Sequence, residues 1–536
     1  MKNTAWLNYS ISILFGIIVW LFFAVFYRHH LHYQEEMQLF LTSGAYFLET
    51  IALPGGLSNY LSRFFTQFFV DSFAGGFCIS LLLVVLQQLI WQISVAQSQL
   101  RAKKSDYYLL SFLPSTAYAC ALMDENVLLT ALIALILVLL AVVFFQRIKS
   151  IKIRLVYLLL MIPLLYWIAG GAYGDFYRYP KIFPVILLII FLLVLFIPIL
   201  CRYLPENSKG KSRIISGCVQ LAVLILLAAW GLKTQANWEK EEIMAYDYFA
   251  RSEKWNSIIH LADNKAPTSP LSVATLNLAL AKQNYLPDYQ FDYFQNGPEG
   301  LLPTFQKEFM VDMMAGEIYY HLGLVNTAQR FAFEGMEAIP GYQKSVRSIQ
   351  RLAETNLING QYEVAKKYLT LLKQTLFYKK WAEETVTYLY NEEKINAHPE
   401  WGKLRQFRPE KDFLFSEQEK DQVLGILYQN NTNNRMAYEY LLAYTLLAKD
   451  LPHFFDYYFM EKKKAGESVP KSYQEALAFI WGQTNFNPEM RPAGLTENAV
   501  IGFQSFSNDY QMKKSEKALA AKYGKTYWYY LLFKYN

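Results

Sequence analysis

The first 232 residues contain long apolar runs that are nearly free of charge. A helix needs roughly 20 mostly apolar residues to cross the hydrocarbon core of a bilayer. Seven segments meet that length, and we expect each of them to span a membrane: residues 7–27, 74–94, 107–123, 127–146, 155–172, 182–201 and 214–232. Residues 1–233 are therefore predicted to form a transmembrane domain.

Lys and Arg residues in the loops predict the orientation of this domain. Twelve of them lie in the short loops on one side of the predicted spans and five on the other. Because the side richer in Lys and Arg stays in the cytoplasm, the N-terminus is predicted to be cytoplasmic. Seven crossings then place residues 234–536 outside, which in a bacterium means an inner-membrane protein with a periplasmic C-terminal domain. The net charge of +6 is small for 536 residues, and nucleic acid is not an expected partner.

The first predicted outer loop begins with an adjacent pair of carboxylates, Glu35 and Glu36. They mark the exit of a helix from the membrane or they line a reaction site. Two amphipathic segments follow, near residues 37–53 and 57–70, and are expected to lie along the membrane surface. The alternative is that these segments pack on the neighbouring spans.

The other two outer loops carry the remaining candidate residues. The turn "MDEN" holds Asp124 and Glu125, which cap a tight hairpin or form a second acidic pair beside Glu35 and Glu36. The loop "GGAYGDFYRYPK" holds Arg178 and Lys181, which suit a phosphate group or anchor the chain at the membrane interface. Three histidines precede Glu35 and would suit a divalent metal, but their spacing matches no standard zinc pattern: His29, His30 and His32.

This layout resembles the GT-C superfamily of polytopic glycosyltransferases. Members have an acidic residue after the first membrane helix and another in the outer turn between helices three and four, which match Glu35 or Glu36 and Asp124 or Glu125. The resemblance implies sugar transfer from a polyprenyl-phosphate donor at the outer face of the membrane. A carboxylate there would deprotonate an acceptor hydroxyl or hold a divalent cation, and Arg178 or Lys181 would bind the donor phosphate.

A second resemblance covers more of the chain but implies no activity. The stretches "EEMQLF", "PGGLSNYLSRFFTQFF" and "GGAYGDFYRYPK" resemble those of uncharacterised polytopic membrane proteins from Bacteroides-type bacteria.

The second half of the chain has many helix-length segments and almost no strand alternation. Residues 315–340 resemble a tetratricopeptide repeat, and a similar pattern recurs at residues 352–373 with an offset of 37 residues. We therefore predict an all-α protein, in which residues 234–536 form a tetratricopeptide-like solenoid after the membrane helices. Weaker copies are expected at residues 245–267 and 437–459, and the last segment, "YGKTYWYYLLFKY", is predicted to pack as a capping helix.

Two functions remain open from the sequence. One is a membrane glycosyltransferase whose repeat domain positions an acceptor. The other is a non-enzymatic scaffold whose repeat domain gathers protein partners of the cell envelope. Phosphate-binding loops, zinc-protease motifs and serine-hydrolase motifs are missing from the sequence, so neither nucleotide chemistry nor these kinds of hydrolysis are expected.

Overall fold

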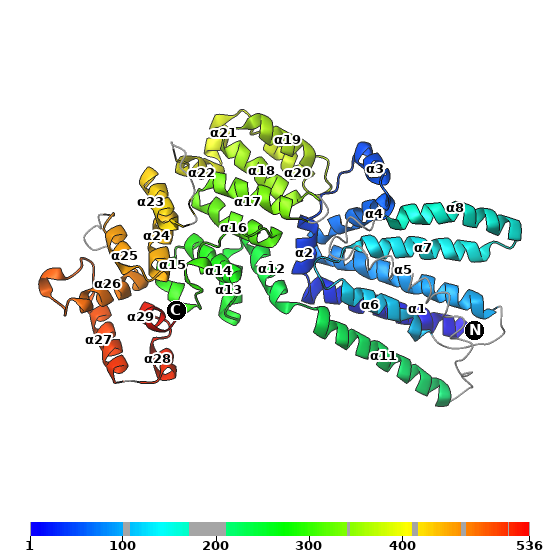
Figure 1. Ribbon diagram of the computed structural model, residues 1–536, viewed down its shortest axis with the longest axis horizontal. Helices are drawn as coiled ribbons and strands as arrows, with labels where there is room; N and C mark the ends of the chain where they lie inside the picture. The colour runs from blue at the N-terminus through cyan, green and yellow to red at the C-terminus, as the bar shows by residue number, and fades with distance from the viewer. Residues whose placement is uncertain are drawn as a thin grey trace. The chain divides into compact units, whose positions relative to one another are not determined.

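The computed structural model describes residues 2–99, 108–170, 211–339, 343–409, 416, 418–461, 468–512 and 514–534. All regular structure among these residues is helical (Figure 1), which confirms the all-α prediction for the described part of the chain. The chain divides into two compact units. Unit 1 comprises Met1–Met244, Ile339–Ile349 and Leu369–Glu384, and unit 2 comprises Ala245–Ala338, Gln350–Tyr368 and Thr385–Asn536.

Among the described residues, four helices of unit 1 are long and apolar enough to cross a membrane. Helix α1 (Lys2–Leu21) continues into a five-residue π-helical turn, η1 (Phe22–Phe26), and the others are α5 (Ser72–Gln99), α7 (Leu129–Arg147) and α11 (Lys211–Gln235). Their apolar stretches are Trp6–Phe26, Ser72–Ser94, Leu129–Arg147 and Ile214–Gln235. These stretches overlap four of the seven predicted spans.

The other three predicted spans are not among these four apolar stretches. Residues 107–123 contain a shorter apolar helix, made of η3 (Leu109–Phe112) and α6 (Leu113–Ala121). Residues 155–172 overlap α8 (Ile151–Gly170). The segment 182–201 lies outside the described residues. A total of seven spans stays a prediction.

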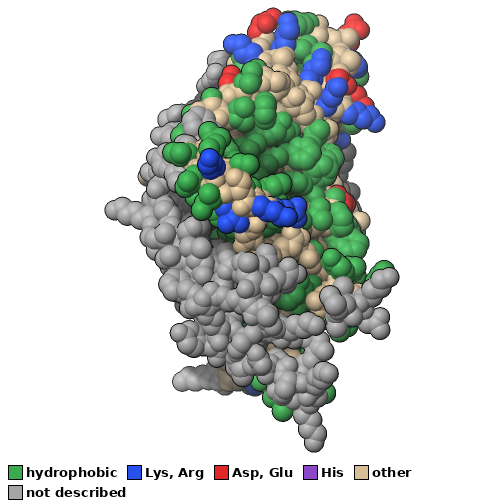
Figure 2. Space-filling view, turned by 90° about the vertical axis from the view of Figure 1, so that its right-hand side faces the viewer, with side chains coloured by type: hydrophobic (Ala, Val, Ile, Leu, Met, Phe, Trp, Pro, Cys, Tyr) green, Lys and Arg blue, Asp and Glu red, His purple; other side chains and the backbone are tan. Residues whose placement is uncertain are grey.

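Small residues allow α1 and α5 to approach closely. A Cβ atom added to Gly76 would lie 3.0 Å from the backbone oxygen of Trp20. The Ser80 hydroxyl donates a hydrogen bond of 2.7 Å to the carbonyl of Gly16. Apolar side chains fill the interior of this bundle and also remain uncovered on its outside, as expected for helices that face lipid. Hydrophobic side chains cover much of the described surface in Figure 2.

The segment predicted to form the first outer loop folds differently from the prediction. It contains α2 (His29–Glu36), α3 (Gly44–Ile51), α4 (Gly56–Thr66) and η2 (Gln67–Val70). The expected helix over 37–53 begins only at residue 44, because the preceding segment makes backbone hydrogen bonds to distant parts of unit 1. The Leu39 N–H donates to the Lys344 carbonyl, and the Thr42 N–H donates to the Gln374 carbonyl, both at 2.8 Å.

Helix α4 packs on the long apolar helix α7 and buries its small side chains. The fully buried positions include Ser58, Ser62 and Thr66, whereas the aromatic and leucine positions of the helix are only half-buried. The segment near 57–70 is therefore helical as predicted. It packs on a neighbouring predicted span, α7, which was the alternative to lying along the membrane surface. Small residues permit this close contact between helices.

Unit 2 is built largely from antiparallel helix pairs. In the clearest pair, α16 (Phe309–Leu322) and α17 (Val325–Ala338), a Cβ atom on Gly316 would lie 3.2 Å from the Cβ of Phe331, and the Phe331 ring stacks on Tyr319 at 5.1 Å. A small residue therefore lies opposite an aromatic ring in this helix pair. The tetratricopeptide-like repeat and the solenoid stay predictions. The C-terminal helix α29 (Tyr527–Phe533) buries four consecutive aromatic residues.

The remaining helices complete the described chain. They are α12 (Trp238–Arg251), α13 (Trp255–Asn264), α14 (Pro270–Lys282), α15 (Leu286–Tyr289), α18 (Val346–Ile358), α19 (Tyr362–Leu372), α20 (Lys379–Val386), α21 (Glu392–Ala397), α22 (Trp401–Phe407), α23 (Lys420–Asn430), α24 (Arg435–Leu447), α25 (Leu451–Tyr458), α26 (Lys471–Gln483), α27 (Glu497–Gln511) and α28 (Glu516–Tyr523).

Candidate functional site

Helix α2 is polar and yet buried along its whole length. Its sequence is "HHLHYQEE", and all eight residues are buried. Buried polar groups must find partners within the protein, because leaving them unpaired costs free energy. The contacts of α2 therefore show what this segment does in unit 1.

The start of α2 is held by a carboxylate from α12. Both oxygens of Glu241 accept backbone hydrogen bonds, from the His29 N–H at 2.7 Å and the His30 N–H at 2.9 Å. A negative charge at this position satisfies free N–H groups and interacts favourably with the helix dipole. Burial raises the pKa of Glu241 to about 7, although the two backbone donors act in the opposite direction.

Glu35 and Glu36 lie in the last turn of α2, which ends before the predicted helix over 37–53. The helix dipole disfavours negative charge at the C-terminal end of a helix. Here other residues supply a counter-charge and a hydrogen bond to the two carboxylates. Glu36 Oε2 lies 2.8 Å from Nη1 of Arg347, and both side chains are almost fully buried, at 1% and 5% exposure. Glu35, which is 0% exposed, accepts a hydrogen bond of 2.9 Å from the Tyr378 hydroxyl.

Asp124 and Glu125 form a tight turn between α6 and α7. The Asn126 backbone N–H donates to Oδ1 of Asp124 at 2.9 Å, which closes the turn. Glu125 forms an ion pair with Lys240 from the first turn of α12. Both carboxylates are partly exposed, unlike Glu35 and Glu36.

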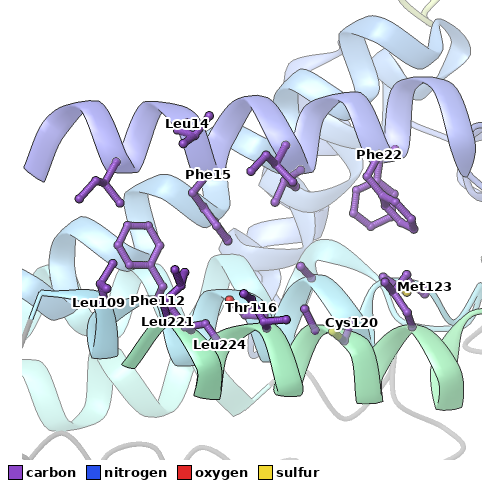
Figure 3. A pocket seen from close by; sticks show the side chains of 18 residues that line it. Leu14, Phe15, Phe22, Leu109, Phe112, Thr116, Cys120, Met123, Leu221 and Leu224 are labelled. Carbon is purple, nitrogen blue, oxygen red and sulfur yellow. The ribbon is translucent and has the colours of Figure 1, made fainter. Parts of the chain in front are cut away.

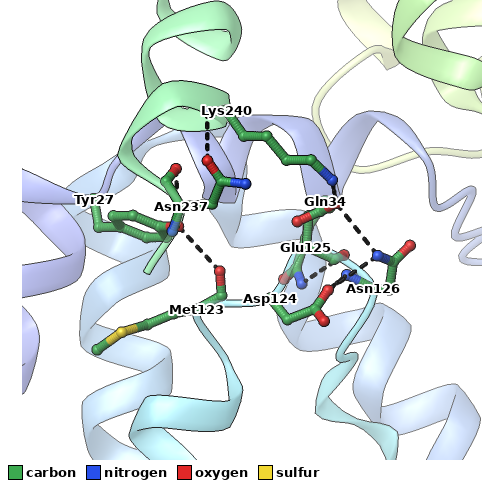
Figure 4. A network of polar contacts seen from close by, with 8 residues as sticks. All are labelled: Tyr27, Gln34, Met123, Asp124, Glu125, Asn126, Asn237 and Lys240. Carbon is green, nitrogen blue, oxygen red and sulfur yellow. Dashed lines mark hydrogen bonds and ion pairs between the residues drawn. The ribbon is translucent and has the colours of Figure 1, made fainter. Parts of the chain in front are cut away.

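The turn at 123–126 is joined to α2 through side chains (Figure 4). The Gln34 amide donates to the backbone carbonyls of Glu125 at 3.2 Å and Val127 at 3.0 Å. The Tyr27 hydroxyl donates to the carbonyl of Met123 at 3.1 Å. The structure therefore brings the two loops together, but the two acidic pairs bind different partners: Arg347 and Tyr378 in one case, Asn126 and Lys240 in the other.

The three histidines of α2 lie within this buried layer. Burial, together with the nearby Arg28 and His32, lowers the pKa of His29 to about 3. Burial likewise lowers the pKa of His30 to about 4. His32 Nδ1 lies 3.0 Å from the carbonyl of Phe69. Within the described part of the chain, these histidines and Glu35 do not converge as a set of three metal ligands.

An apolar cavity of about 370 Å³ lies among apolar helices of unit 1, close to the same turn (Figure 3). Side chains of α1, α6 and α11 line it, and Thr116 contributes a hydroxyl among hydrocarbon groups. Met123, which lines one part of this cavity, is followed directly by Asp124 and Glu125. The cavity offers an apolar chain a place between the helices, next to a polar turn.

Several residues of this site were not predicted from the sequence. Arg347 and Tyr378 lie more than 300 positions from their partners, and no local pattern connects them. A buried carboxylate requires a partner, but the sequence does not reveal that Glu35 and Glu36 are buried. Arg178 and Lys181, the predicted phosphate-binding residues, lie outside the described residues.

The comparisons with known proteins identify a family. The family model described as "Family of unknown function (DUF6057)" matches residues 2–176 and 172–534. Comparison with curated proteins and with solved structures gave no match. The chain therefore belongs to DUF6057, a family of unknown function.

Proposed function

We propose that this protein is a non-enzymatic membrane scaffold, in which unit 1 anchors a helical domain that gathers protein partners of the cell envelope. The single observation that carries the proposal is the burial of Glu35 and Glu36 against Tyr378 and Arg347. A general base or a metal-binding carboxylate must reach its substrate. A carboxylate that is 1% exposed and paired with a buried guanidinium is suited to holding segments of the chain together instead.

The proposed location is the bacterial inner membrane, with a cytoplasmic N-terminus and a periplasmic C-terminal domain. The distribution of Lys and Arg in the loops supports this orientation, and the four apolar helices support membrane insertion. The paired helices of unit 2, including α16 with α17, support a repeat domain that binds protein partners.

Replacing the Glu36–Arg347 ion pair by apolar side chains distinguishes a structural role of the pair from a catalytic role of the Glu36 carboxylate. We expect the double variant Glu36→Met/Arg347→Met to accumulate normally, because apolar residues of similar volume often replace a buried ion pair without loss of stability. In a strain that lacks the gene, this variant is then expected to restore the wild-type phenotype.

The single variants Glu36→Met and Arg347→Met are the matched controls, since each leaves one buried charge without its present partner. Both are expected to reduce protein abundance. A double variant that accumulates normally in the membrane but fails to restore the phenotype would contradict the scaffold proposal and indicate that the Glu36 carboxylate itself is required.

A second candidate function is glycosyl transfer of the GT-C type, and the apolar cavity favours it. A polyprenyl chain would fit among the apolar side chains of α1, α6 and α11. Its phosphate would then lie near the turn of Asp124 and Glu125, where Lys240 supplies a positive charge. In this alternative Asp124 or Glu125 activates the acceptor or holds a divalent cation, and Arg178 and Lys181 bind the phosphate.

Substitution of the partly exposed acidic turn tests this second candidate. Asp124→Asn and Glu125→Gln preserve size, and Glu49→Gln on α3 changes an exposed carboxylate in the first outer loop as a matched control. Loss of a surface glycan in the turn variants, at normal abundance and with an unchanged control, would support the enzyme. A glycan profile equal to wild type in both turn variants would refute this role of the turn.

A further inference from the structure

Three side chains of types that bind metal ions converge in unit 2. They are Glu253 in the turn after α12, His321 in the last turn of α16 and Glu400 at the start of α22. One ligand atom from each lies within 4.8 Å of the other two. His321 is buried, Glu400 is partly buried and Glu253 is exposed, so the group is open to solvent on one side.

The atoms of this group present lone pairs toward one another. Nδ1 of His321 lies 3.2 Å from the ammonium of Lys282, and so acts as an acceptor toward that cation. Oε1 of Glu400 lies 3.5 Å from the same Nδ1, is buried and makes no hydrogen bond with the described residues. An imidazole nitrogen that accepts from Lys282 has no proton to give to Glu400. Both atoms therefore favour a cation between them.

The charges around the group are not balanced. Glu317 and Glu354 are bound by Arg351, at 2.5 Å and 2.8 Å. That ion-pair triad already carries one excess negative charge. Glu253 and Glu400 add two further negative charges, and Lys282 contributes one positive charge.

The formal charge of these six groups is therefore −2 when all are ionised. Unbalanced negative charge in a partly buried site is unfavourable. A divalent cation would offset this charge.

We propose that Glu253, His321 and Glu400 bind a first-row divalent transition metal, with zinc as the ion of choice, and that Lys282 competes with the metal for this position. Imidazole with carboxylates is a ligand set that suits such ions. Zinc bonds of about 2.0–2.1 Å in a tetrahedral site place neighbouring ligand atoms roughly 3.4 Å apart, and the His321–Glu400 separation is 3.5 Å.

The remaining ligand, Glu253, is on the exposed side of the group and has room to move. Three protein ligands leave a coordination position for water or for a small ligand, as in zinc sites that are not purely structural. The proposal does not depend on whether unit 1 is a scaffold or an enzyme.

Zinc titration of the full chain in detergent tests the proposal. The purified protein is treated with a chelator, and zinc affinity is then measured by competition with a fluorescent zinc indicator. We expect one site in wild type and a loss of affinity of at least about tenfold in Glu253→Gln. Because Glu253 is exposed, this variant is expected to fold. Lys282→Gln removes the competing cation and is expected to bind zinc more tightly than wild type.

His260→Gln is the matched control, since His260 is an exposed histidine on α13. It is expected to bind zinc like wild type. Cobalt provides a second readout, because Co²⁺ bound by nitrogen and oxygen ligands gives a visible absorption band that Glu253→Gln should weaken. Equal zinc affinity in wild type and Glu253→Gln, or unchanged affinity in Lys282→Gln, would overturn the proposal.

Discussion

The carboxylate of Glu36 and the guanidinium of Arg347 form a buried ion pair of 2.8 Å between residues 311 positions apart in the sequence. Both residues belong to unit 1. A short segment from the second half of the chain is thus part of the unit that contains the four long apolar helices. The Tyr378 hydroxyl, which binds Glu35, belongs to a second such segment.

Arg347→Met should destabilise the protein strongly. It leaves the Glu36 carboxylate buried without the guanidinium, and breaking a buried ion pair from one side costs about 3–5 kcal/mol. Tyr378→Phe is a milder test, because it removes one hydrogen bond to a carboxylate, worth about 1.5–3 kcal/mol. Thermal unfolding in detergent should rank the two variants in this order. Arg347→Met at wild-type stability would contradict the burial of this pair.

Gly76→Ala should weaken the packing of α1 on α5. The added methyl group would lie 3.0 Å from a backbone oxygen of Trp20, and overpacking of this kind costs about 1–3 kcal/mol. Gly217→Ala is the matched control, since a Cβ atom at Gly217 on α11 meets no atom within 4 Å. A lower melting temperature is expected for the first variant, and equal melting temperatures for both would argue against this helix contact.

Ionisation of Glu475 should lower the free energy of unfolding as pH rises. Burial raises its pKa to about 7 from the ordinary value of 4.5, so the folded state binds a proton that the unfolded state has released between these pH values. Its stabilising contribution is complete below pH 4.5 and is lost as pH rises through 7.

The variant Glu475→Gln does not titrate and can still accept the hydrogen bond from the Tyr527 N–H, which is 2.6 Å in the wild type. Compared with this variant, the wild-type protein should lose about 2–3 kcal/mol between pH 4.5 and 8. Melting temperatures of both proteins across this range measure the difference. A constant difference would show that Glu475 has an ordinary pKa.

Cysteine accessibility should reveal the orientation in the membrane. The native cysteines are replaced, and single cysteines are introduced at two exposed positions, Lys149 and Glu516. In cells with a permeable outer membrane and an intact inner membrane, an impermeant maleimide should label position 516 and not position 149. The reverse pattern would place the C-terminal domain in the cytoplasm.

Local patterns in the sequence predicted much of the fold but only part of the candidate site. The apolar runs predicted four helices that the structure describes, because the length and the composition of an apolar helix are local properties of the sequence. The helix over 37–53 was predicted too long. Its amphipathic spacing could not reveal that Leu39 and Thr42 make backbone hydrogen bonds to residues 344 and 374.

The sequence by itself determined that this chain is helical, that its first half is apolar enough for a membrane, and that acidic residues follow the first long helix. Only the tertiary structure decided what those acidic residues contact. Glu35 and Glu36 are buried because Tyr378 and Arg347, from distant segments, supply a hydrogen bond and a counter-charge. Desolvation and pairing of charges depend on neighbours in space, and a single sequence does not specify which distant residues those neighbours are.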